Sequence, residues 1–337
     1  FTCFKQIKNK FYKGVVIMCT AVSLISKQNE VLFGRTMDFS HELNPETYIV
    51  PKDYEWQSIA SNDKFTNKYK FIGSGQNIGK IIFADGMNEQ GLGVAVLYFP
   101  GYAVFSEEIK TNKKNIASLE VVNYLLGNCA NTKEVIQTMP TLEIIGIQDE
   151  ITNSIAPLHW IVSDKYGQTI TVEKTANGTE IINNPIGVLA NSPNFSWHLT
   201  NLNNYMNISP YQLEEINWSN FPLKPFGQGA GGLGIPGDYT SPSRFVRIAF
   251  QKNFLMLPDN KKQAPLACFE LMKTVSIPKG IVMTNKNSPD YTQYTVFMNL
   301  NTGDYYFNSY LNSEIKQYNI NNINPVEITS LGKIKKY

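Results

Sequence analysis

The chain has 337 residues, of which 42% are hydrophobic and 17% are charged, a composition typical of a globular protein rather than a disordered one. Its formal net charge of +2 provides no electrostatic basis for binding nucleic acid or an anionic membrane surface. No apolar run approaches the ~20 residues that a membrane-spanning helix needs.

The first 17 residues do not resemble a signal peptide, because their apolar stretch is too short and no A-x-A cleavage site follows it. Lys13-Gly14-Val15 can be encoded by a purine-rich ribosome-binding sequence shortly before the codon of Met18. Translated leader DNA is the favoured interpretation, and a genuine propeptide is the alternative. We expect residues 1–18 to be a leader or upstream extension that is removed or absent in the mature protein, with residues 19–337 forming a single domain.

Beyond this segment, the pattern alternates between strand hairpins and pairs of helices. Hairpins are predicted at residues 19–39, 81–100 and 158–173, single strands at 184–193, 291–300 and 304–310, and helices at 116–130, 132–142, 243–256 and 265–275. Asn131 is a plausible N-cap for the second helix. This order argues against a parallel βαβ sheet and predicts an α+β fold, with antiparallel sheets covered by helices.

Several chemistries lack support in the sequence. The four cysteines (Cys3, Cys19, Cys129 and Cys268) have no paired CxxC spacing, which argues against a disulfide framework or a metal site and favours a reducing cytoplasm. The G-x-G-x-x-G match at residues 227–232 has neither a preceding strand nor a following helix, so we reject a dinucleotide site. His159 and His198 lie among aromatic residues, where a packed, hydrogen-bonded role is favoured over catalysis. No cofactor is predicted.

Cys19 is the candidate nucleophile if it becomes the first residue. Its α-amino group, with a pKa near ~8, could then take the thiol proton and later donate it to a leaving amine. Arg35 and Asp38 follow on the next predicted strand. Arg35 would favour the thiolate, and Asp38 would accept hydrogen bonds from the α-amine. Taken alone, the pair could equally be a surface salt bridge.

The chain resembles the penicillin V acylase and conjugated bile acid hydrolase (choloylglycine hydrolase) family of the N-terminal nucleophile superfamily, from Met18 to near the C-terminus. The motifs that carry the resemblance are MCT, FGRTMDF, FADGMNEQGLG, LYFPGYA, LHWIVSD, GVLANSPNFSWH, PFGQGAGGLGIPGDYTSPSRFVR and IPKG.

The resemblance implies roles for five residues. The nucleophile of the family falls on Cys19, and its conserved arginine and aspartate fall on Arg35 and Asp38. Asn191 corresponds to the asparagine whose side-chain amide donates to the oxyanion. Arg244 corresponds to the arginine that steadies the charges around the nucleophile.

Three further residues are candidates for binding the acyl group. The backbone N–H of Tyr98 would complete the oxyanion hole, and its ring could stack on a phenoxyacetyl group or merely fill the inner face of its strand. Tyrosine here is typical of the acylase branch, whereas many bile salt hydrolases carry asparagine. Met37 and Phe39 could line an apolar acyl pocket, although a core role is equally supported.

The resemblance also implies a four-layer αββα fold and a homotetramer, with residues 194–226 similar to a protruding assembly segment. It implies a metal-free amidase that hydrolyses a non-peptide C–N amide of a small molecule. Penicillin V is the favoured substrate and conjugated bile salts are the alternative; N-acyl homoserine lactones share the amide geometry. A hypothesis of another class is a non-catalytic binder of amphipathic amides in which Cys19 stays internal.

Overall fold

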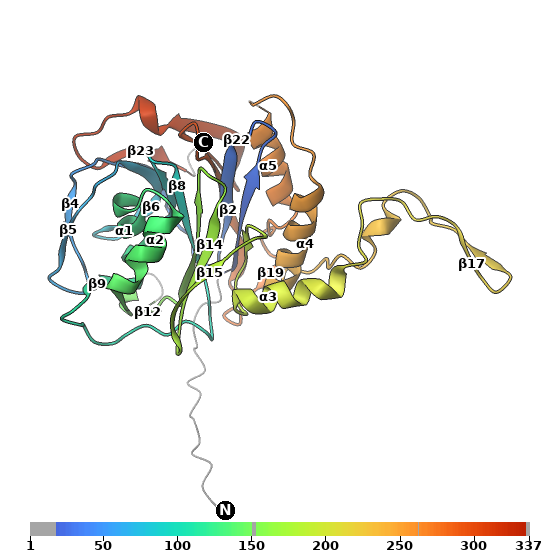
Figure 1. Cartoon of the computed structure of the whole chain (residues 1–337), viewed down its shortest axis with the longest axis horizontal. Coiled ribbons are helices and arrows are strands. Elements are labelled where there is room, and N and C mark those ends of the chain that lie inside the picture. The colour runs from blue at the N-terminus through green and yellow to red at the C-terminus, as the bar shows by residue number, and fades with distance from the viewer. Residues whose placement is uncertain (1–17, 150–152, 262, 335–337) are drawn as a thin grey trace, which may run out of the picture.

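The computed structural model describes residues 18–149, 153–261 and 263–334, so residues 1–17 of the predicted leader lie outside this range. Two large antiparallel sheets pack against each other, and helices cover their outer faces (Figure 1). The prediction of antiparallel sheets between helices is therefore confirmed. Within the described residues, no helix is long and apolar enough to cross a membrane.

The first sheet has the order β16-β1-β2-β20-β21-β22, with β19 also paired to β20. Its strands are β1 (Met18–Ile25), β2 (Val31–Phe39), β16 (Val188–Leu189), β19 (Val282–Met283), β20 (Pro289–Asn299), β21 (Asp304–Ser309) and β22 (Asn312–Asn319). The β1–β2 hairpin agrees with the predicted one, and its register places Cys19 opposite Met37. The nucleophile candidate thus lies at the open end of the hairpin.

The second sheet has the order β15-β14-β13-β8-β7-β6-β3-β23. Its strands are β3 (Glu46–Val50), β6 (Phe71–Asn77), β7 (Ile81–Asn88), β8 (Leu92–Tyr98), β13 (Leu158–Asp164), β14 (Thr169–Thr175), β15 (Gly178–Asn183) and β23 (Thr329–Lys333). The predicted glycine-rich bend between β7 and β8 is present, with Gly91 at a φ of +82°, in the left-handed region that glycine tolerates.

Helices form the two outer layers. They are α1 (Val121–Asn128), α2 (Thr132–Thr138), α3 (Phe195–Asn201), α4 (Ser241–Phe254) and α5 (Ala264–Lys273). Helices α4 and α5 pack on the first sheet, and α1 packs on β7 and β8 of the second. Asn131 caps α2 as predicted, because its side chain accepts a hydrogen bond from the backbone N–H of Glu134.

The predicted helix at 116–130 was too long. Residues 114–117 form strand β9 (Lys114–Ala117), which pairs in parallel with β10 (Leu142–Ile145), and a 3₁₀ turn η1 (Ser118–Glu120) follows before α1 begins.

The remaining short elements are β4 (Glu55–Gln57), β5 (Lys64–Thr66), β11 (Gln148–Asp149), β12 (Ser154–Ile155), η2 (Met139–Thr141), η3 (Leu202–Tyr205), η4 (Ala230–Gly232) and η5 (Ile320–Asn322).

Two apolar cores result from this layering. The first core lies between the two sheets and under α4 and α5, and includes Val22 and Ile72 from opposite sheets. The second core lies between the second sheet and α1, and includes Trp160 and Val122.

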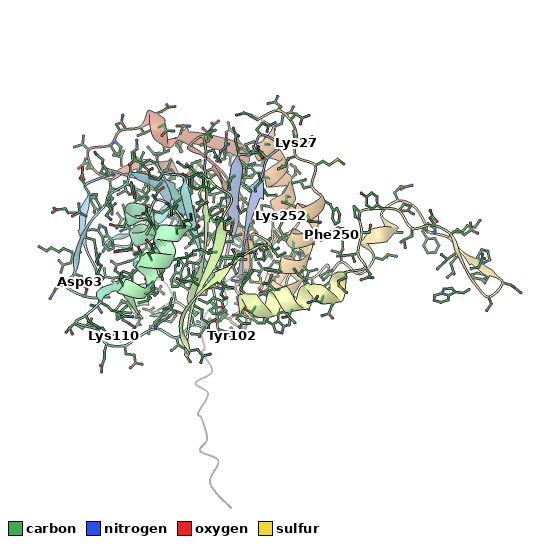
Figure 2. All side chains as sticks on the ribbon, in the orientation of Figure 1. Lys27, Asp63, Tyr102, Lys110, Phe250 and Lys252 are labelled. Carbon is green, nitrogen blue, oxygen red and sulfur yellow. The ribbon has the colours of Figure 1, made fainter. Side chains whose placement is uncertain are left out.

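An arm extends away from these layers. It begins after α3 and includes a hairpin of β17 (Ile216–Trp218) and β18 (Phe221–Leu223), whose side chains project clear of the body (Figure 2). Trp218 and Phe221 are 70% and 68% exposed.

Candidate active site

The Cys19 thiol lies buried at the start of β1, where the hairpin register brings it next to β2. The guanidinium of Arg35, also fully buried, donates from Nη2 to Cys19 Sγ at 2.8 Å. Burial raises the pKa of the Cys19 thiol, and the positive charge of Arg35 opposes that increase. Arg35 therefore lies beside the thiol, and its role in favouring the thiolate stays a prediction.

Arg35 is held by groups from both sheets. Its Nε donates to the Thr36 carbonyl at 2.8 Å, and its Nη1 lies 3.4 Å from Oδ2 of Asp85 on β7. Asp85 in turn accepts hydrogen bonds from the hydroxyls of Tyr294 at 3.1 Å and Tyr305 at 2.6 Å. These bonds fix the guanidinium beside the thiol.

Asp85 was missed in the sequence analysis, although it lies in the quoted FADGMNEQGLG motif. The available signal was a carboxylate in the middle of an apolar strand, since buried acids are rare unless they are paired.

Asn191 connects the nucleophile to two other predicted residues. Its Oδ1 accepts from the backbone N–H of Cys19 at 2.8 Å and from Arg244 Nη2 at 2.7 Å, while its Nδ2 donates to the Tyr98 carbonyl at 2.8 Å. A side-chain amide has a second N–H, which the predicted role would use to bind an oxyanion.

The position of Asp38 differs from the expectation. Its carboxylate accepts from Thr292 at 2.6 Å and from Thr36 at 3.2 Å, and Cys19 N donates instead to Asn191. The physical reason is that Cys19 N is a peptide nitrogen here, because Met18 precedes it in β1. Asp38 therefore has no α-amine to orient in this form of the chain.

Arg244, near the start of α4, reaches the same cluster. Its Nη1 donates to the Cys19 carbonyl and to Thr20 Oγ1, both at 2.6 Å, and lies 3.9 Å from Asp38 Oδ2. Burial lowers the pKa of Arg244 and raises the pKa of Asp38. The charge of each residue opposes the shift in the other. The guanidinium of Arg35 thus lies close to the carboxyl group of Asp85, and that of Arg244 lies close to the carboxyl group of Asp38.

An apolar cavity of about 130 Å³ opens beside the thiol. Met37, Phe39 and Tyr98 all contribute to its wall, and the rings of Phe39 and Tyr98 lie 6.4 Å apart. Met37 and Phe39 also belong to the first core, so both of the roles considered for them are compatible with their positions.

The two histidines hold the segment that carries Asn191. His159 Nε2 lies 3.0 Å from the carbonyl of Ala190, and His198 Nε2 lies 2.9 Å from the carbonyl of Asn191. Both rings are stacked on phenylalanines, as a packed role predicts. Within the described residues, no group of three or more His, Cys, Asp or Glu side chains could hold a metal ion.

Comparison with known proteins agrees with this architecture. Residues 19–330 match the model of the linear amide C–N hydrolases, choloylglycine hydrolase family. The protein is therefore an enzyme of the class that hydrolyses linear amide C–N bonds. Within that class, the chain belongs to the choloylglycine hydrolase family.

Individual relatives fall on both branches of this family. Bile salt hydrolase/transferase of Clostridium perfringens is 36% identical over 310 residues, covering 91% of this chain and 94% of that protein. A solved structure of a variant of conjugated bile acid hydrolase from the same species superposes with a TM-score of 0.87 at 34% identity, covering 94% of this chain and 97% of that one. Penicillin V acylase of Pectobacterium atrosepticum is 23% identical over 334 residues, covering 92% of this chain and 83% of that protein.

The position of Asn191 leads to a first prediction. We expect Asn191→Ala, in protein that begins at Cys19, to lower kcat by roughly 10²- to 10³-fold, because it removes an oxyanion donor. Single-turnover kinetics on an amide substrate would measure the loss. Asn177→Ala, at an exposed turn, is the control. An Asn191→Ala enzyme with undiminished kcat would exclude the side chain from transition-state stabilisation.

Burial lowers the pKa of His198 from 6.5 to about 4, which leads to a second prediction. Between these pH values the unfolded chain binds a proton that the folded chain does not. The free energy of unfolding should therefore fall by about 3 kcal/mol as the pH drops from 7 to 4 through this group alone. In His198→Gln, which keeps an N–H donor, urea titrations at several pH values should show that the free energy of unfolding falls less steeply as the pH drops. The same pH dependence in variant and wild type would contradict the lowered pKa of His198.

Proposed function

We propose that this protein hydrolyses the amide bond of conjugated bile acids and releases the bile acid and its glycine or taurine. The main observation behind this proposal is that the Cys19 thiol lies 2.8 Å from Arg35 Nη2 and lines an apolar cavity suited to the acyl group. The relatives named above support the substrate, since identity is 36% to a bile salt hydrolase/transferase and 23% to a penicillin V acylase. This preference reverses the order of substrates expected from Tyr98 alone.

The proposed chemistry requires Cys19 as the first residue of the mature chain. The free α-amine then takes the thiol proton, and Sγ attacks the amide carbon to give a tetrahedral oxyanion. The side-chain amide of Asn191 and the backbone N–H of Tyr98 bind that oxyanion. The amine returns the proton to the leaving nitrogen as the C–N bond breaks, and water then hydrolyses the thioester to release the acid and regenerate the thiol.

Penicillin V is the second candidate substrate, and one observation favours it. Tyr98 and Phe39 present two aromatic rings to the cavity next to the thiol, which suits the phenoxy ring of that acyl group.

A direct assay separates the two substrates. For protein expressed from Met18, we expect kcat/KM on glycocholate to exceed that on penicillin V by at least tenfold, with Cys19→Ala as the inactive blank. Intact mass confirms that the chain starts at Cys19. The opposite ratio would make the protein a penicillin V acylase that uses the same residues. A Cys19-started protein inactive on every amide tested would favour a binding role.

We further propose that the chain assembles as a homotetramer through the arm. Exposed aromatic side chains such as Trp218 and Phe221 are characteristic of protein–protein contacts, and a single copy leaves both uncovered.

Light scattering after gel filtration tests this assembly. The wild type should have four times the mass of its single mature chain, and the double variant Trp218→Ser, Phe221→Ser should shift to smaller species. Tyr166→Ser, at an equally exposed turn between β13 and β14, should leave the mass unchanged. A wild-type monomer, or a variant that remains a tetramer, would reject the arm as the interface.

A further inference from the structure

The cavity beside Cys19 extends from one core of the protein into the other. Its wall includes Cys19 and Phe39 from the core between the sheets, and Val122 and Trp160 from the core under α1. A route through the second sheet exists because β7 and β8 separate. Their described pairing is short: it begins with Met87 opposite Gly93 and ends with Asp85 opposite Ala95. Residues beyond that last pair, on both strands, line the cavity.

Two buried polar side chains form part of the wall on the α1 side. Ser118 lies on η1, immediately before α1, and Trp160 lies on β13. They are 1% and 0% exposed. Neither Ser118 Oγ nor Trp160 Nε1 has a hydrogen-bond partner anywhere in the part of the chain that the structure describes.

Such atoms are unfavourable in an apolar wall. A buried hydroxyl or indole N–H without a partner costs on the order of 1–3 kcal/mol, and native proteins contain few of them. By contrast, Ser74, in the wall near Asp85, is hydrogen-bonded to Tyr305. Two residues that line one cavity thus carry unpartnered polar atoms, which points to a ligand that supplies their partners.

We propose that Ser118 and Trp160 form a subsite that recognises an oxygen at the end of the acyl group remote from the scissile amide. The indole N–H can only donate, whereas the serine hydroxyl both donates and accepts. A hydroxyl group satisfies both residues, and a keto oxygen can accept from both. This inference rests on the function proposed above, because the amide carbonyl must lie at Cys19 for the acyl group to extend toward α1.

The subsite discriminates between the two candidate acyl groups. A hydroxylated steroid acid carries oxygen on rings far from its side-chain amide, whereas the only non-carbonyl oxygen of a phenoxyacetyl group lies one carbon from the amide carbonyl. An acyl group that leaves both polar atoms without partners loses their hydrogen bonds, and sites built to bind a hydroxyl reject analogues that lack it.

The test uses two glycine amides that differ in one hydroxyl: lithocholylglycine, hydroxylated on the ring farthest from the amide, and 5β-cholanoylglycine, which has no hydroxyl. For protein expressed from Met18 and assayed below micellar concentrations, kcat/KM should be at least tenfold higher for the hydroxylated amide. Ser118→Ala and Trp160→Phe should each reduce that ratio by about three- to tenfold, since a neutral hydrogen bond contributes roughly this factor.

Thr47→Val is the matched control. The hydroxyl of Thr47 is equally buried and has no hydrogen-bond partner among the described residues, but Thr47 does not line this cavity. Its variant should keep the wild-type ratio.

Binding of the free acids gives a readout without catalysis. In Cys19→Ala protein, calorimetry should show tighter binding of lithocholate than of 5β-cholanate, and adding Ser118→Ala should abolish most of the difference. If both amides are cleaved but neither subsite variant changes the ratio, the subsite is rejected and the hydrolase function stands. If neither amide is cleaved but the binding difference is present, the subsite stands and the proposed function fails. If there is neither cleavage nor a binding difference, both are overturned.

Discussion

The contact between the Arg35 guanidinium and the Cys19 thiol is the interaction around which the rest of the site is organised. A fully buried guanidinium is costly unless opposite charge and hydrogen-bond acceptors surround it. Here β2 supplies the arginine, β7 of the other sheet supplies Asp85, and β20 and β21 supply the tyrosines that hold Asp85. The face-to-face packing of the two sheets is therefore tied to the electrostatics of one side chain.

Asn191 and Arg244 extend this arrangement to the far side of the nucleophile. Together they contact the N–H and the carbonyl of Cys19, so the backbone of the residue is fixed as well as its thiol. Because two histidines hold the carbonyls at positions 190 and 191, the oxyanion candidate is supported from behind by packed rings. Rigid support of this kind reduces the reorganisation needed when charge develops at the substrate.

The sequence could predict some of these features for clear physical reasons. Alternating apolar residues defined the β1–β2 hairpin, and the hairpin alone brings Arg35 close to Cys19. Asn191 and Arg244 are separated from Cys19 by more than 170 residues and were identified only through family motifs. Asp85 was missed because its partners come from strands distant in sequence. The helix at 116–130 was overextended because apolar periodicity cannot distinguish a short buried strand and a 3₁₀ turn from the first turns of a helix.

The separation of β7 from β8 has a consequence for how such an enzyme can diverge. Its reaction centre packs within one core, whereas the remote part of its cavity packs within another. Substitutions under α1 can reshape the remote part without disturbing the buried charges, because the sheet stands between them. The fold thus allows substrate preference to drift over evolutionary time while the hydrolytic apparatus stays constant.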